Sequence, residues 1–73
     1  MNTATSTIER FYRDHHPAIL KLVTRRVGDS HLAEDITADI FALALRSLTQ
    51  GVEPRDPRAW LATIAANRVT THW

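Results

Sequence analysis

The amino-acid sequence predicts an all-α fold, a three-helix bundle, because three amphipathic segments are separated by two breaks. The segments are residues 6–27, 30–48 and 57–72. In each segment apolar residues recur with the period of a helix, and no alternating pattern typical of a strand competes with them. A chain of 73 residues buries only about 60% of the surface that its unfolded form exposes. We therefore expect residues 1–73 to form a single domain that is marginally stable without a partner.

The first helix is expected to begin near Ser6 and to end at Gly28. Ser6 is a typical N-cap residue, and Glu9 three positions later completes a capping box. Gly28 suits the left-handed conformation that ends many helices. Pro17 lies on the polar side, where an opened backbone carbonyl still faces water, so we predict one helix that bends there. Its core side consists of Ile8, Phe11, Tyr12, Ile19, Leu22, Val23 and Val27.

The second helix, residues 30–48, is apolar over more of its circumference than one packing contact requires. Asp29 or Ser30 caps its N-terminus. Its apolar residues span about 220° of a helical wheel, wider than the stripe of an ordinary surface helix. They are Leu32, Ala33, Ile36, Ile40, Phe41, Leu43, Ala44, Leu45 and Leu48. We expect part of this surface to meet a partner.

The remaining arc of the second helix combines acids with small side chains. Its residues are Asp35, Ala38, Asp39, Ala42 and Arg46. Small side chains allow another helix to approach closely, and carboxylates accept hydrogen bonds from basic residues. A docking face for a partner helix explains this pattern. An ordinary solvated face, with acids favoured near the helix N-terminus, explains it equally well.

The third helix has the clearest start. Asp56 is a good N-cap residue, and Pro57 follows at the first helical position, where its missing N–H costs nothing. The loop before it, residues 49–58, contains glycine and proline, which interrupt helices. The predicted core side of this helix consists of Trp60, Leu61, Ile64, Ala65 and Val69.

Composition and charge restrict the class of protein. The sequence has no cysteine, which excludes disulfides and thiolate metal sites and fits a reducing, cytoplasmic setting. No run of about 18 apolar residues predicts a membrane span, and the N-terminal residues lack the features of a signal peptide. Residues 1–28 have five bases and two acids (+3), residues 29–45 four acids and no Lys or Arg (−4), and residues 46–73 four bases and two acids (+2). An acidic block therefore lies between two basic blocks.

The sequence predicts no catalytic or metal centre. His15 and His16 are adjacent and so point about 100° apart on a helix. No cysteine or suitably spaced carboxylate completes a tetrahedral site with these residues, His31 or His72. There is also no nucleophile with a base and an orienting group, and no glycine-rich phosphate loop. We therefore expect a protein that binds rather than catalyses and that needs no cofactor.

Two motifs in a particular order resemble a known family. A first amphipathic helix that ends in Gly28-Asp29 is followed by AEDITADIF at residues 33–41, and a loop leads to AWLATIAANR at residues 59–68. Together they resemble region 2 of the extracytoplasmic-function (ECF) sigma factors of the sigma-70 family, over nearly the whole chain. The resemblance implies a helical bundle that binds RNA polymerase core and captures the melted minus-ten element of a promoter.

The resemblance implies that the second helix binds the clamp helices of the largest polymerase subunit. The positions that match the binding surface of the family are Asp35, Ala38, Asp39, Phe41 and Ala42. Ala38 stands where members often have glutamine, so no side-chain hydrogen bond to the polymerase is expected there.

The resemblance also implies that the third helix and its preceding loop trap a flipped base of the non-template minus-ten strand. A pocket that hydrogen-bonds the base edge offsets the cost of unstacking. Asn67 matches the asparagine of this pocket, and its amide can both donate and accept; a solvent-facing or backbone-bonded asparagine is the alternative. We expect Asn67 to face the loop at residues 51–58. The other candidate DNA contacts are Arg55, Arg58, Thr63, where a basic residue is common in the family, and Arg68.

The expected function is that of an alternative sigma factor fragment. The loop at residues 49–58 has no aromatic residue, whereas housekeeping sigma factors have several in this part of the domain to drive melting. Sigma region 4, which reads the minus-thirty-five element, is absent from this chain, so we expect a truncated protein. The family also implies an anti-sigma factor as a partner and no membrane partner. A stand-alone helical interaction domain, bound by an anti-sigma factor and without a direct role on DNA, is the alternative function.

Overall fold

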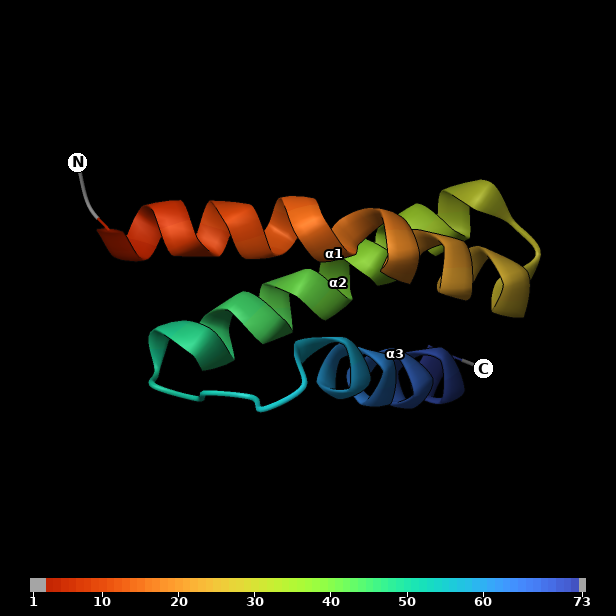
Figure 1. The fold of residues 1–73 in the computed structure, drawn as a ribbon. Coiled ribbons are helices and arrows are strands. Elements are labelled where there is room, and N and C mark those ends of the chain that lie inside the picture. Colours follow the sequence, from red (N-terminus) through yellow and green to blue (C-terminus); the bar gives the residue numbers. More distant parts are fainter. Residues whose placement is uncertain (1–2, 73) are drawn as a thin grey trace.

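A computed structural model describes the backbone of residues 3–72 and the side chains of residues 8–71, and it contains three α-helices. They are α1 (Thr3–Val27), α2 (Ser30–Thr49) and α3 (Pro57–His72). Successive helices run in opposite directions, and each contacts both others in a bundle of 39 × 18 × 17 Å (Figure 1). The predicted all-α, three-helix fold is confirmed.

The first helix continues through its internal proline but begins earlier than the capping pattern predicted. α1 extends from Thr3 to Val27 without a break at Pro17. Figure 1 shows that its axis changes direction in the second half. The predicted N-cap at Ser6 is wrong, because Ser6 lies inside the helix. No glycine or proline occurs in residues 3–6, so each added residue extends the helix at little cost.

A two-residue connection joins α1 to α2. Gly28 has φ 71°, as its position at the end of α1 requires, and its N–H donates to the carbonyl of Thr24 at 2.9 Å. The Oδ1 atom of Asp29 accepts from the N–H of Leu32 at 3.0 Å, so Asp29 is the N-cap of α2. Both ends of this connection are therefore as predicted, and the tight turn folds α2 back along α1.

The C-terminus of α2 forms a Schellman motif that the sequence did not reveal. The N–H of Val52 donates to the carbonyl of Ser47 at 3.0 Å, and the N–H of Gly51 donates to the carbonyl of Leu48 at 3.1 Å. Gly51 has φ 98°, which a residue with a Cβ rarely adopts. This motif fixes the direction in which the chain leaves α2 toward α3.

The start of α3 is as predicted. Pro57 is the first helical residue, and the Oδ1 atom of Asp56 accepts from the N–H of Ala59 at 3.2 Å.

The wide apolar arc of α2 is buried by the two other helices of the same chain. The side chains of Ala33, Ile40 and Ala44 are fully buried, and Ile36 is 5% exposed. α2 contacts both α1 and α3, which explains why one stripe was not enough. The expectation that a partner covers part of this arc is therefore wrong for most of its residues. Only Leu43, at 38% exposure, remains an exposed large apolar side chain of the arc.

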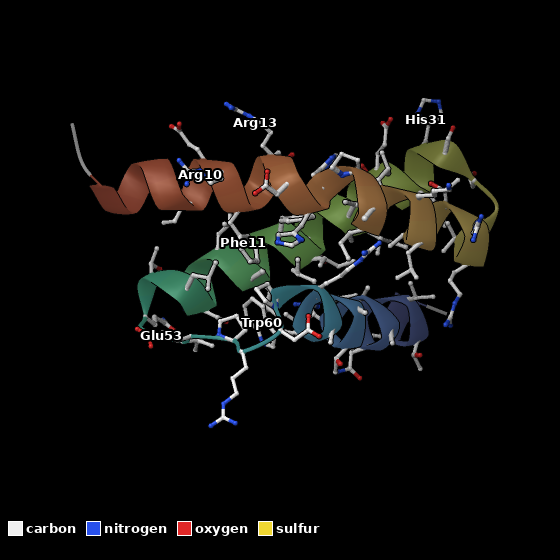
Figure 2. All side chains as sticks on the ribbon, viewed as in Figure 1. Arg10, Phe11, Arg13, His31, Glu53 and Trp60 are labelled. Carbon is white, nitrogen blue, oxygen red and sulfur yellow. The ribbon has the colours of Figure 1, made fainter. Side chains whose placement is uncertain are left out.

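Aromatic side chains connect the three helices near the open end of the bundle. The ring of Phe11 lies 6.5 Å from that of Phe41 and 6.3 Å from that of Trp60, both edge to face. Figure 2 shows Phe11 and Trp60 directed toward the interior, whereas Arg13 extends from the opposite side of α1. Trp60 packs against the core but is only partly buried. Edge-to-face pairs of this kind add to the stability gained by burying their area.

One polar side chain in the core has no hydrogen-bond partner among the described residues. Thr37 is completely buried, and its Oγ1 atom is unsatisfied, although a helical threonine commonly donates to the carbonyl four residues earlier. A buried polar group without a partner costs about 1–3 kcal/mol. The sequence analysis did not single out this residue.

We expect Thr37→Val to raise the free energy of unfolding by about 1 kcal/mol, because valine has the same shape and no hydroxyl to desolvate. Thr24→Val is the matched control, since the hydroxyl of Thr24 donates to the carbonyl of Leu20 at 2.7 Å and its removal brings no such gain. Urea denaturation followed by circular dichroism measures both variants. A Thr37→Val protein no more stable than the parent would show that this hydroxyl is satisfied in solution.

Candidate binding surfaces

An exposed face of α2 combines acidic and small side chains. Asp35, Ala38, Asp39, Ala42 and Arg46 are all exposed, and together they form what we call the acidic α2 face. The two alanines leave the helix backbone accessible, and the two carboxylates flank them one turn apart. This face can accept a helix that brings basic side chains to the carboxylates.

Phe41 does not belong to this face. Its side chain is 1% exposed, and its ring lies 5.0 Å from that of Tyr12 and 5.5 Å from that of His16. A side chain covered in this way has no surface to offer to a partner, so the prediction that Phe41 contacts the polymerase is corrected. Its role is to hold α1 against α2 beneath the exposed residues.

A groove between α2 and α3 lies beside the acidic α2 face. It consists of two adjoining hollows of about 230 and 290 Å³ that share Arg68 and Thr71. Its lining residues, which define the α2/α3 groove, are Ile36, Asp39 and Leu43 from α2 and Ile64, Asn67, Arg68 and Thr71 from α3. Asp39 thus belongs to both the acidic α2 face and this groove.

The structure brings Asn67 to the α2/α3 groove and not to the loop. The hollow that contains Asn67 is lined only by residues of α2 and α3. Asn67 is exposed, and its backbone carbonyl accepts from the hydroxyl of Thr71 at 2.8 Å. The prediction that Asn67 faces the loop is therefore wrong, because the antiparallel packing of α3 on α2 turns this residue toward Leu43. Its amide remains accessible to a ligand in the groove.

The other predicted DNA contacts are spread along α3 and its preceding loop. Arg55 and Arg58 are exposed near the start of α3, and Arg58 is nine residues, about 14 Å, along the helix from Asn67. The hydroxyl of Thr63 donates to the carbonyl of Ala59 at 3.0 Å. Arg68 is half-buried in the groove. These residues therefore form no single pocket, but an extended ligand could contact several of them.

A separate apolar hollow of about 460 Å³ lies beside the loop. It is lined by Ile8, Phe11, Leu48, Thr49, Val52, Glu53 and Pro54. Figure 2 places Glu53 on the connection between α2 and α3. The sequence analysis missed this hollow, because it forms only where the ends of α1 and α2 meet the loop. The exposed Val52, at 42%, was the one local signal, an apolar side chain in an otherwise polar loop.

Two other classes of site are not found in the described part of the chain. No group of three or more histidine and acidic residues is arranged to hold a metal ion there. His15 and His16 instead pack their rings on Phe11 and Tyr12, at centroid distances of 4.8 Å in both pairs. No helix among the described residues has both the length and the apolar character needed to cross a membrane.

Comparison with known proteins identifies these surfaces. Residues 11–73 match the family model described as Sigma-70 region 2. The chain is 38% identical over 65 residues to "ECF RNA polymerase sigma factor BldN" of Streptomyces coelicolor, covering 88% of this chain and 25% of that protein. It is also 38% identical over 63 residues to "Ferric citrate uptake sigma factor FecI" of Escherichia coli, covering 86% of this chain and 36% of that protein. The chain thus spans about a third or less of the length of these relatives. No solved structure matches it significantly.

We expect Phe41→Ala to lower the free energy of unfolding by about 3–5 kcal/mol, since it removes a fully buried ring from the junction of the helices. Glu34→Ala on the exposed side of the same helix should change it by no more than about 0.5 kcal/mol. Thermal denaturation measures both. A Phe41→Ala protein as stable as the parent would return Phe41 to the list of candidate surface contacts.

Proposed function

Because the chain belongs to the sigma-70 family, as a region 2 domain of the ECF group, we propose that it binds RNA polymerase core and recognises the melted minus-ten element of promoters. The observation that carries the proposal is the proximity of two exposed features. The acidic α2 face and the groove that contains Asn67 adjoin along α2, with Asp39 common to both. A domain of this shape can hold the polymerase and the DNA at the same time.

The polymerase side of the proposal rests on the acidic α2 face. The clamp helices of the largest polymerase subunit would lie across Ala38 and Ala42, where α2 has no bulky side chain. Asp35 and Asp39 would then accept hydrogen bonds from basic residues of those helices. Phe41 supports this contact from beneath, through its packing with Tyr12 and His16.

The DNA side of the proposal rests on α3. Asn67 would bind the edge of a base of the non-template minus-ten strand, since its amide offers both a donor and an acceptor in an accessible groove. Arg55, Arg58 and Arg68 would bind phosphates, and the half-buried Arg68 is the one held nearest to Asn67. The hydroxyl of Thr63 adds a weaker polar contact. Two or three phosphate contacts give weak binding, so DNA recognition would depend on the polymerase.

An anti-sigma factor is a second partner that the same surfaces support. An inhibitor with a basic helix would compete with the clamp helices for the acidic α2 face. If this were the only partner of the domain, it would be a stand-alone interaction module without a role on DNA. The accessible amide of Asn67 beside Arg68 favours the DNA-binding function over this alternative.

The proposed mechanism involves binding and no bond cleavage, in keeping with the sigma family, whose members are transcription initiation factors. It takes place in the bacterial cytoplasm, where the polymerase and the promoter DNA are located.

We expect Asp39→Arg to weaken binding to purified bacterial core polymerase by about 2–5 kcal/mol, because the substitution replaces an attraction to a basic partner helix by a repulsion. Co-precipitation and fluorescence anisotropy measure the affinity, and far-ultraviolet circular dichroism checks that the helices are retained. Asp14→Arg, the same charge change on the exposed surface of α1, is the matched control. Equal binding by the Asp39→Arg and parent proteins would remove the polymerase surface from α2.

We expect Asn67→Ala to abolish the preference for one base within the minus-ten element, a discrimination of about 1–3 kcal/mol. The measurement is transcription in vitro by core polymerase with the chain, fused to the remaining regions of a related sigma factor, from templates randomised over the minus-ten region. Sequencing of the transcripts gives the preference at each position. Thr70→Ala, at an exposed position of the same helix, should keep every preference. A uniform loss over all sequences in the Asn67→Ala protein would assign Asn67 to a phosphate contact.

A further inference from the structure

The α2/α3 groove places an acid opposite a base. Since α2 and α3 are antiparallel, residue numbers increase along one wall of the groove and decrease along the other (Figure 1). The α2 wall advances through Ile36, Asp39 and Leu43, in steps of about one turn. The α3 wall returns through Thr71, Arg68 and Ile64 in the same steps. In this register Asp39 lies across from Arg68.

These two residues are the only charged ones that line the α2/α3 groove among the described residues. Asp39 is exposed, and Arg68 is half-buried, so its guanidinium group has limited freedom to move away. Ile36, Leu43 and Ile64 make the walls beside them apolar. Apolar walls lower the local dielectric constant, which strengthens the interaction of Asp39 with any charge that enters the groove.

A phosphate that approaches Arg68 therefore meets two obstacles. The carboxylate of Asp39 repels the phosphate, and it also attracts the same guanidinium group that the phosphate would bind. Both effects disappear when the charge of Asp39 is neutralised. In the proposed function Asp39 is one of the residues that accept a basic side chain of the polymerase, so docking supplies this neutralisation.

We propose that Asp39 acts as an electrostatic brake on DNA binding: it keeps the affinity of the free domain for single-stranded DNA low, and docking of the polymerase on α2 releases Arg68 for the DNA. This inference rests on the proposed function, since it couples the two surfaces described there. Because binding free energies are reciprocal, DNA in the groove strengthens polymerase docking by the same factor. A sigma domain with such a brake avoids occupying DNA before it meets the polymerase.

The test is the affinity of the 73-residue chain, without polymerase, for a short fluorescein-labelled single strand of randomised sequence at low salt. Asp39→Asn removes the charge and keeps the shape of the side chain. We expect it to bind the strand about two- to fivefold more tightly than the parent, the range of an interaction between exposed charges. The increase should shrink as salt is added, because salt screens the repulsion.

Two further variants separate a local brake from the effect of net charge. Glu34→Gln makes the same charge change on the exposed surface of α2, but Glu34 does not line the groove, so its affinity should equal that of the parent. In the background of Arg68→Ala, which removes the base across the groove, Asp39→Asn should give less than half of its original increase. Circular dichroism of each variant checks that the helices are retained.

Each other outcome overturns the inference. An unchanged affinity of Asp39→Asn, or no detectable binding by that variant, would show that Asp39 does not restrain DNA binding. An equal increase in Glu34→Gln, or a full increase without Arg68, would assign the effect to net charge alone. None of these results bears on whether the domain binds polymerase or selects minus-ten sequences when the polymerase is present, so the proposed function would stand or fall separately.

Discussion

The position of α2 between α1 and α3 is the constraint on which the rest of the structure depends. A helix that packs against two neighbours must be apolar over most of its circumference, and only a narrow strip of its surface then reaches solvent. In this chain the buried side of α2 includes Ile40, Phe41 and Ala44, and the strip that remains contains Asp35 and Asp39. Every residue available for a partner on α2 is therefore a residue that packing has left over.

This arrangement also explains why the two candidate surfaces share a border. The short turn at Gly28 and the Schellman motif at Gly51 reverse the chain twice, so that α3 returns along α2 in the opposite direction. Its second half, with Asn67 and Arg68, then comes to lie beside the middle of α2. A protein that binds its partners through adjacent surfaces of two rigid helices can transmit the charge state of one surface to the other without a change of shape.

A small bundle of this kind gains much of its stability from a few large side chains. The rings of Phe11, Phe41 and Trp60 meet where all three helices are close together, and they connect segments that are far apart in the sequence. The buried hydroxyl of Thr37 works in the opposite direction, because nothing among the described residues compensates its desolvation. The core is therefore not optimised for stability, as is usual in natural proteins.

The sequence by itself determined the fold class, the helix caps at Asp29 and Asp56 and the exposed α2 strip, because these depend on local hydrogen bonds and on helical periodicity. It misplaced the start of α1, since a capping pattern at Ser6 does not end a helix that can continue through it. Only the tertiary structure decided that the apolar arc of α2 is covered from within the chain and that Phe41 is covered too. It also decided that Asn67 lies in a groove opposite α2 and not beside the loop. A helical wheel gives the direction of a side chain about its own axis, but which helix occupies that direction depends on packing between segments distant in the sequence.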